Sequence, residues 1–233
     1  MPARVVLVVD TGVDDALALM VAARHPGIDL HGVVCTAGNV PLRRALANTV
    51  YVLDLLGVDV PVAAGADRRL DGRPFAVRDV HGPDGLAGLA PPIQDLPAGW
   101  PPPGAVASRE AVTVSLAPLT SLVGLGTGRI VASFARPGET NHRLDPVAAR
   151  AVAASGRALD HLDAGREVVS ADVGGSLSRA DDRLCRLAGG LLVHQAARRA
   201  GLGDASAVLR LAEPELDPAL HTRRVVGLVL GED

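Results

Sequence analysis

The pattern of hydrophobic and polar positions at the start of the chain predicts a buried strand followed by a helix. Val5 to Val9 form an unbroken apolar run, which is typical of a strand covered on both faces. The run stops at a polar cluster, and a helical stretch from Ala16 to Arg24 follows before Pro26-Gly27. We therefore expect the polar cluster to lie where the first strand ends, at the edge of a sheet.

The same alternation of strand and helix patterns continues along the chain. The expected elements are a strand from Ile28 to Thr36, a helix from Leu42 to Leu56 with Gly57 as its stop, and strands from Val58 to Ala64, Ala111 to Leu116 and Arg129 to Phe134. A further helix is expected from Pro118 to Leu125. Strands that alternate with helices pair in parallel through right-handed crossovers, which predicts an α/β fold with a mainly parallel sheet.

The second half of the chain has weaker signals. Residues 65–109 are rich in Gly, Pro and Asp, and a loop of that length is usually functional or mobile. Later we expect a helix from Pro146 to Ala154 with Asp145 as its N-cap, a helix from Leu184 to Ala200, a short helix from Ala205 to Leu211 capped by Asp204, and a last strand from Val225 to Leu230. Neither a repeat nor a linker is evident, so we expect one domain over residues 1–233.

Composition narrows the class of protein. The chain is 48% hydrophobic but only 2% aromatic, so Ala, Val and Leu must fill the core. The net charge of −3 comes without any block of like charge, which argues against binding to nucleic acid or to an anionic membrane. Cys35 and Cys185 are too few for a disulfide framework. The sequence shows neither a signal peptide nor an apolar run long enough to span a bilayer, so we expect a soluble cytoplasmic protein.

Three aspartates follow the first strand and are the first candidates for chemistry. Asp10, Asp14 and Asp15 lie within six residues, with Gly12 between them. Buried carboxylates this close repel one another, and a divalent cation is the usual reason to hold them together. The alternative is that Asp14 and Asp15 only cap and charge the first turn of a helix.

Polar groups recur at the ends of later strands. Asn39 follows the second strand, and the turn from Leu116 to Thr120 follows a later one. The carboxyl ends of parallel strands lie side by side, so these groups can share one crevice. Carboxylates and backbone carbonyls suit a hard cation such as calcium or magnesium. Asn39 could also be a simple turn residue beside Gly38.

Six short motifs in order resemble those of a known enzyme family. Asp10 to Leu17 (DTGVDDAL) resembles the D-x-D-P-G-x-D-D-A-x-A-L signature of the inosine–uridine-type nucleoside hydrolases. Five further stretches resemble this family in the same order: Gly38-Asn39, His81 to Gly88 (HGPDGLAG), Leu116 to Ser121 (LAPLTS), Pro137 to Pro146, and Asp204 to Leu216. The chain is identified as a shortened and divergent member of that family, which implies a Rossmann-like sheet with helices on both faces.

The resemblance also implies an activity and a set of site residues. The implied reaction is hydrolysis of the N-glycosidic bond of a nucleoside by a calcium-bound water that Asp10 activates as general base. The implied calcium ligands are Asp10, Asp15, Asp204 and the backbone carbonyl of Leu116. The implied substrate-binding residues are Asp14, Asn39, His81, Glu139, Asn141 and Asp204. Members of the family are commonly dimers or tetramers, so a homo-oligomer is expected.

The sequence departs from the family pattern at three positions. Val8 stands where the family usually has the first aspartate of its signature, and Thr11 replaces the proline. Gly203 stands where many members have a histidine thought to protonate the leaving base. Two functions of different class therefore remain open: an active calcium-dependent hydrolase, and a catalytically weak or inactive homologue that binds a ribosyl ligand or a partner protein.

Overall fold

A six-stranded parallel sheet forms the centre of the computed structural model, which describes residues 1–76, 79–93, 96–162, 171–198, 200 and 202–231. The strand order is β3-β2-β1-β4-β5-β6. The strands are β1 (Ala3–Val9), β2 (Ile28–Cys35), β3 (Val62–Ala64), β4 (Val112–Ser115), β5 (Ile130–Ser133) and β6 (Leu159–Leu162). Every neighbouring pair is parallel, which confirms the expected Rossmann-like α/β fold.

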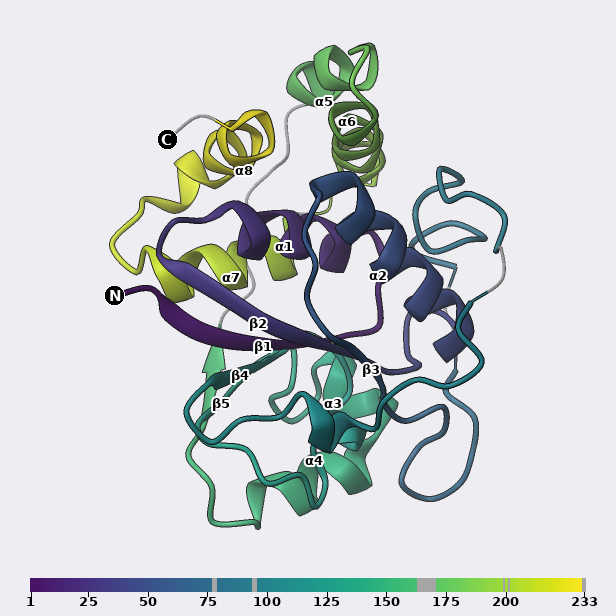
Figure 1. Cartoon of the computed structure of the whole chain (residues 1–233), viewed down its shortest axis with the longest axis vertical. Coiled ribbons are helices and arrows are strands. Elements are labelled where there is room, and N and C mark those ends of the chain that lie inside the picture. The colour runs from purple at the N-terminus through teal and green to yellow at the C-terminus, as the bar shows by residue number, and fades with distance from the viewer. Residues whose placement is uncertain (77–78, 94–95, 163–170, 199, 201, 232–233) are drawn as a thin grey trace.

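Helices cover both faces of this sheet (Figure 1). On one face lie α1 (Val13–Arg24), α2 (Leu42–Leu56) and α7 (Asp204–Ala212), with α5 (Ala171–Ser178), α6 (Arg183–Ala197) and α8 (His221–Leu230) stacked beyond them. On the other face lie α3 (Thr140–Leu144), α4 (Pro146–Ala153) and the 3₁₀ turn η2 (Leu119–Leu122). Two further 3₁₀ turns are η1 (Pro103–Ala105) and η3 (Pro218–Leu220). Among the described residues no helix is both long and apolar enough to cross a membrane.

The alternating side chains of β1 feed two separate apolar clusters. Val5, Leu7 and Val9 pack with α1 and α2 on one face, whereas Val6 and Val8 pack on the other. Val8 is fully buried in the second cluster. The position where the family usually has an aspartate is therefore part of the hydrocarbon core here.

Helix α1 is enclosed on nearly every side. It contacts α2, α6, α7 and α8 as well as β2, and its residues 15–22 are all buried. A helix that is apolar all round is stable only in such a position. The amino end of α1, which carries Asp14 and Asp15, is therefore held in place by most of the core on this face.

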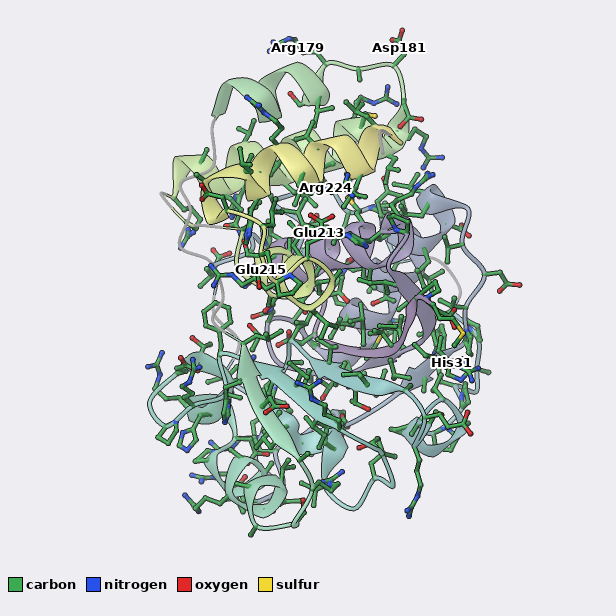
Figure 2. The ribbon with its side chains drawn as sticks, turned by 90° about the vertical axis from the view of Figure 1, so that its left-hand side faces the viewer. His31, Arg179, Asp181, Glu213, Glu215 and Arg224 are labelled. Atoms are coloured by element: carbon green, nitrogen blue, oxygen red, sulfur yellow. The ribbon has the colours of Figure 1, made fainter. Side chains whose placement is uncertain are left out.

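The far end of α1 is tied down by an ion-pair cluster. The Glu213 Oε1 atom lies 2.7 Å from His25 Nε2 and accepts a hydrogen bond from Arg224 Nε at 2.8 Å. His25 follows α1, Glu213 follows α7, and Arg224 belongs to α8. Figure 2 labels Glu213 and Arg224, which lie near each other. The pairs with His25 and Arg224 hold the pKa of the Glu213 carboxyl below its usual value, although burial opposes this. The cluster joins the ends of α1 and α7 to α8.

Several predicted elements are confirmed with small changes. Helix α2 ends as expected, because Gly57 adopts a left-handed conformation with φ of 65°. The Asp145 carboxylate accepts the amide of Ala148 and so caps α4. Helix α1 begins three residues before Ala16. The third strand is shorter than predicted, because only residues 62–64 pair with β2.

Other predictions are wrong. The stretch from Val225 to Leu230 is helical rather than a strand, since it belongs to α8. The buried residues of that helix are His221, Val225, Leu228 and Val229, whose spacing forms one helical face. The stretch from Pro118 to Leu125 forms only the short η2 turn. The helices α3 and α5 and the strand β6 were not predicted from the sequence pattern.

Candidate active site

The turn between β1 and α1 brings the first carboxylates together. Asp10 follows the last residue of β1, and Asp15 lies in the first turn of α1. The Asp15 carboxylate accepts the amide of Gly12 at 3.0 Å and that of Asp10 at 3.4 Å. Asp15 therefore does cap the helix, as the simpler interpretation of the sequence proposed, and this cap holds its oxygens beside Asp10.

Asn39 joins the end of β2 to both carboxylates. Its backbone amide donates to Asp10 Oδ2 at 2.7 Å, and its side-chain Nδ2 donates to Asp10 Oδ1 at 3.0 Å. The same Nδ2 atom donates to Asp15 Oδ2, also at 3.0 Å. The sequence placed Asn39 near the aspartates, and its position between Asp10 and Asp15 shows that it orients both of them.

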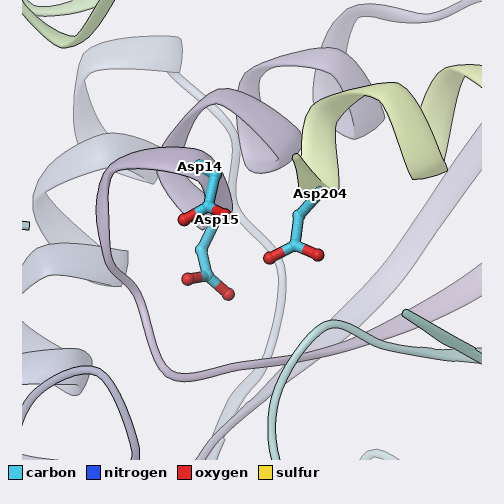
Figure 3. A group of neighbouring side chains, drawn as sticks. All are labelled: Asp14, Asp15 and Asp204. Atoms are coloured by element: carbon cyan, nitrogen blue, oxygen red, sulfur yellow. The ribbon is translucent and has the colours of Figure 1, made fainter. Parts of the chain in front are cut away.

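Asp204 completes a cluster of carboxylates from distant parts of the chain. It begins α7, which packs against α1. One carboxylate oxygen each from Asp14, Asp15 and Asp204 lie within 4.8 Å of one another (Figure 3). Asp14 Oδ1 and Asp204 Oδ1 are buried and have no hydrogen-bond partner among the described residues. Buried carboxylate oxygens without donors are the kind of ligand that a hard divalent cation takes.

Burial, and then repulsion between neighbouring carboxylates, raise several pKa values in this cluster. Burial raises the pKa of Asp15 to about 7, with a further contribution from the charge of Asp14. Burial, and then the charge of Asp15, raise the pKa of Asp10 well above its ordinary value. The pKa of Asp204 is also raised, by burial and then by the charges of Asp14 and Asp15. A divalent cation would remove this cost, so the residues present fit a metal site.

His81 approaches the cluster from the long loop. Its Nδ1 atom lies 3.6 Å from Asp14 Oδ1 and accepts the backbone amide of Val13 at 3.2 Å. Asp84, which is not among the predicted site residues, shapes this loop, because its carboxylate accepts the amides of Leu86, Gly88 and Ala90. An aspartate followed by glycine in a Gly-rich segment is the signal that could have identified it.

Leu116 and Asn141 are in direct contact. Asn141 Nδ2 donates to the Leu116 carbonyl at 2.7 Å and to the Ser133 carbonyl at 3.0 Å. These bonds tie the start of α3 to the ends of β4 and β5. The assignment of the Leu116 carbonyl to the metal stays a prediction.

Glu139 has only local contacts among the hydrogen bonds and ion pairs of the described residues. Its Oε2 atom accepts the backbone amide of Arg136 at 2.8 Å, and its Oε1 atom lies 3.6 Å from Arg136 Nη1. The structure therefore places Glu139 at the turn before α3 and does not join it to the aspartates through any of these bonds. Its role in substrate binding stays a prediction.

Gly203 packs directly against Asp14. Its φ is 53° and its ψ is −117°, a conformation that favours glycine. A Cβ atom at this position would lie 2.6 Å from Asp14 Oδ2. With this backbone there is no room for the histidine that many family members have at Gly203, so the departure from the family pattern has a structural counterpart.

Gly38→Ala should destabilise the protein more than Gly126→Ala does. A Cβ atom at Gly38 would overlap Asp10 Oδ2, so Asp10 or the backbone must move. We expect a loss of stability of about 1–3 kcal/mol, measured by chemical denaturation, because overpacking a rigid site has a cost of this order. Gly126→Ala is the matched control, since nothing lies within 4 Å of its added Cβ. Equal stability of both variants would contradict the packing described here.

Comparisons with known proteins point to one family. A family model described as "Inosine-uridine preferring nucleoside hydrolase" matches residues 5–127, which is more than half of the chain. The pyrimidine-specific ribonucleoside hydrolase RihB of Escherichia coli (strain SE11) is 40% identical over 85 residues, which are 36% of this chain and 27% of RihB. An uncharacterised protein in the ribF 3′ region of Corynebacterium ammoniagenes is 49% identical over 88 residues, which are 36% of this chain and 91% of that protein.

Two solved structures share the fold. The plant nucleoside hydrolase PpNRh1 superposes with a TM-score of 0.78 at 24% identity, over 93% of this chain and 80% of that one. A purine-preferring ribonucleoside hydrolase from Gardnerella vaginalis gives a TM-score of 0.77 at 22% identity, over 91% of this chain and 81% of that one. Together with the match over residues 5–127, the fold and the buried aspartates lead to one conclusion. The chain belongs to the inosine-uridine preferring nucleoside hydrolase family.

Proposed function

We propose that the chain hydrolyses the N-glycosidic bond of a ribonucleoside. Water attacks C1′ of the ribose, the bond from C1′ to the base nitrogen breaks, and the base leaves with the electron pair. The observation that carries this proposal is the carboxylate cluster of half-buried Asp14 with buried Asp15 and Asp204, beside Asp10. It lies near the point where the strand order reverses between β1 and β4, which is the usual place for a ligand in such a sheet.

Calcium is the cation that we propose for this cluster. Asp15 and Asp204 would hold it, together with Asp10 and the Leu116 carbonyl, and the oxygen of Asp14 is close enough to contribute. When bound, such an ion lowers the pKa of a neighbouring water molecule and neutralises the surrounding carboxylates. All of these ligands are oxygen atoms, which suits a hard cation.

The side chains around the ion have separate tasks in this proposal. Asp10 takes the proton of the attacking water as the general base. Asn39 keeps the Asp10 carboxylate in one orientation through two hydrogen bonds. The proposed ribose contacts, which position C1′ for attack, are Asp14, Asn39, His81, Glu139, Asn141 and Asp204.

A panel of purine and pyrimidine ribonucleosides tests the proposal. We expect release of reducing sugar from at least one of them, loss of that activity after treatment with a chelator, and recovery when calcium is added back. The purified protein should also contain bound calcium by elemental analysis. Absence of reducing sugar from every nucleoside, together with absence of calcium, would refute the enzyme assignment.

Gly203 favours a second candidate, a homologue that binds ribosyl ligands with little turnover. Because Gly203 packs against Asp14 and has no side chain, it cannot protonate a leaving base. A riboside with a good leaving group, such as p-nitrophenyl riboside, needs no such proton. If p-nitrophenyl riboside is hydrolysed but natural nucleosides are only bound, acid assistance is the missing element and the second candidate is correct for natural substrates.

A further inference from the structure

A pocket of about 410 Å³ adjoins the aspartate cluster. It is lined by residues 39–41, Arg44, Asp79 and the Gly82-Pro83 turn. Asn39 belongs both to this pocket and to the site, since its amide groups bind Asp10 and Asp15. Gly82 follows His81, whose ring approaches Asp14. A ligand that reaches the aspartates with its ribose therefore has this pocket beside it for another part of the molecule.

Arg44 supplies the positive charge among the residues that line this pocket. Its Nη1 atom donates to the Pro91 carbonyl at 3.1 Å, which anchors the half-buried guanidinium. No carboxylate lies within ion-pair distance of Arg44 in the part of the chain that the structure describes. A guanidinium has five donors in a fixed fork, so most of them remain for a planar anionic group.

The amino end of α2 adds positive electrostatic potential at the same pocket. The helix is 15 residues long and begins at Leu42, directly after the lining residue Pro41. The positive end of its dipole therefore lies at the pocket and favours negative charge there. Asp79, the acidic residue of the lining, has an exposed side chain, so solvent screens its charge. The charges and the helix dipole at the pocket together therefore favour an anion.

We propose that this pocket binds an anionic group of the substrate, a carboxylate or a phosphate, through Arg44. The proposal rests on the proposed function, because it names the kind of ribosyl compound that the same site takes. The anionic group has two possible sources with the same chemistry, a carboxylate on the base or a phosphate on the ribose. Either forms charge-assisted hydrogen bonds with a guanidinium.

Two pairs of probes that differ in one charged group distinguish these sources. The first pair is nicotinic acid riboside and nicotinamide riboside, which differ only in a carboxylate against a carboxamide. The second pair is uridine 5′-monophosphate and uridine. Dissociation constants are measured by titration calorimetry with calcium present, and hydrolysis of each probe is followed separately. We expect the anionic member of one pair to bind about tenfold more tightly, and that pair identifies the source.

Three variants assign the effect to the pocket. Arg44→Gln should abolish the preference for the anionic member. Asp79→Asn should increase it only slightly, because solvent screens the like charge that is removed from the lining. Arg43→Gln is the matched control, since Arg43 is an exposed neighbour outside the lining and its loss should leave the preference unchanged. Each variant is compared with the parent by thermal unfolding, so a misfolded protein is recognised.

Equal affinity within both pairs, a preference that survives Arg44→Gln, or no measurable binding of any probe would overturn the assignment. The pocket assignment and the proposed hydrolase function can be refuted separately. If an Arg44-dependent preference occurs without hydrolysis of any probe, the pocket assignment stands and the hydrolase function fails. If neutral nucleosides are hydrolysed and neither pair shows a preference, the function stands and the pocket assignment fails.

Discussion

Asp10→Asn should lower the rate of nucleoside hydrolysis by about a thousandfold, because an amide cannot take the proton of the attacking water. The change is nearly isosteric and leaves one oxygen to accept from Asn39, which now donates to both oxygens of Asp10. It also removes a buried charge whose pKa is raised by burial and by Asp15. The calcium-free variant should therefore unfold at a temperature no lower than the parent does. Steady-state kinetics and thermal unfolding measure the two effects together.

A control with the same chemical change separates this effect from a general loss of charge. Asp59 is exposed and lies between α2 and β3, so Asp59→Asn should leave both activity and stability unchanged. Asp10→Ala should be inactive as well, and its circular dichroism spectrum should match that of the parent. An Asp10→Asn protein that turns over nucleosides at the parent rate would refute the proposed base.

The calcium-free protein should become less stable as the pH rises from about 4 to about 7. The pKa of Asp15 is about 7 in the folded chain, against 3.8 for an ordinary aspartate, because of burial and the charge of Asp14. Between these values the folded state keeps a proton that the unfolded chain has released, so raising the pH favours unfolding. For Asp15 alone the effect is of the order of 4 kcal/mol. The raised pKa values of Asp10 and Asp204 act in the same direction.

Calcium should reverse this loss. Above pH 7 the carboxylates are charged, so saturating calcium should raise the unfolding temperature strongly, whereas near pH 4 it should have little effect because protons occupy the ligands. Denaturant unfolding at several pH values, with chelator and with calcium, measures both curves. Asp59→Asn should give the same two curves as the parent. A stability that is flat or rises between pH 4 and 7 in chelator would contradict the raised pKa values of Asp10, Asp15 and Asp204.

Much of the fold could be predicted because the first half of the chain has strong local signals. The apolar run from Val5 to Val9 and the helix that ends at Gly57 need no information from the rest of the protein. The pattern of residues 225–230 wrongly predicts a strand, because β-branched and apolar residues in a short run fit either structure. Packing against α1 and α6 decides in favour of a helix there. Strand β6 and helix α5 lack a clear periodicity, so tertiary contacts must define them.

The candidate site could be located from the sequence, but its internal contacts could not. Asp10 and Asn39 follow neighbouring strands and Asp15 begins the helix after the first of them, and these positions follow from the α/β pattern. The hydrogen bonds of Asn39 to two carboxylates depend on the register between β1 and β2. The contact of Gly203 with Asp14 depends on how α7 packs against α1, which no local pattern encodes. The single domain and the homo-oligomer stay predictions.

The enclosure of α1 has a consequence for how this protein can evolve. The helix is anchored by aspartates at one end and by the ion-pair cluster of His25, Glu213 and Arg224 at the other. We expect its backbone amides to exchange with solvent only when the whole core opens. The amino end of α1, with Asp14 and Asp15, therefore cannot move independently of the core. The pocket beside it is lined partly by the loop around Asp79 and Pro83. New substrate preferences can therefore arise by mutation of that loop while the carboxylate cluster is inherited unchanged.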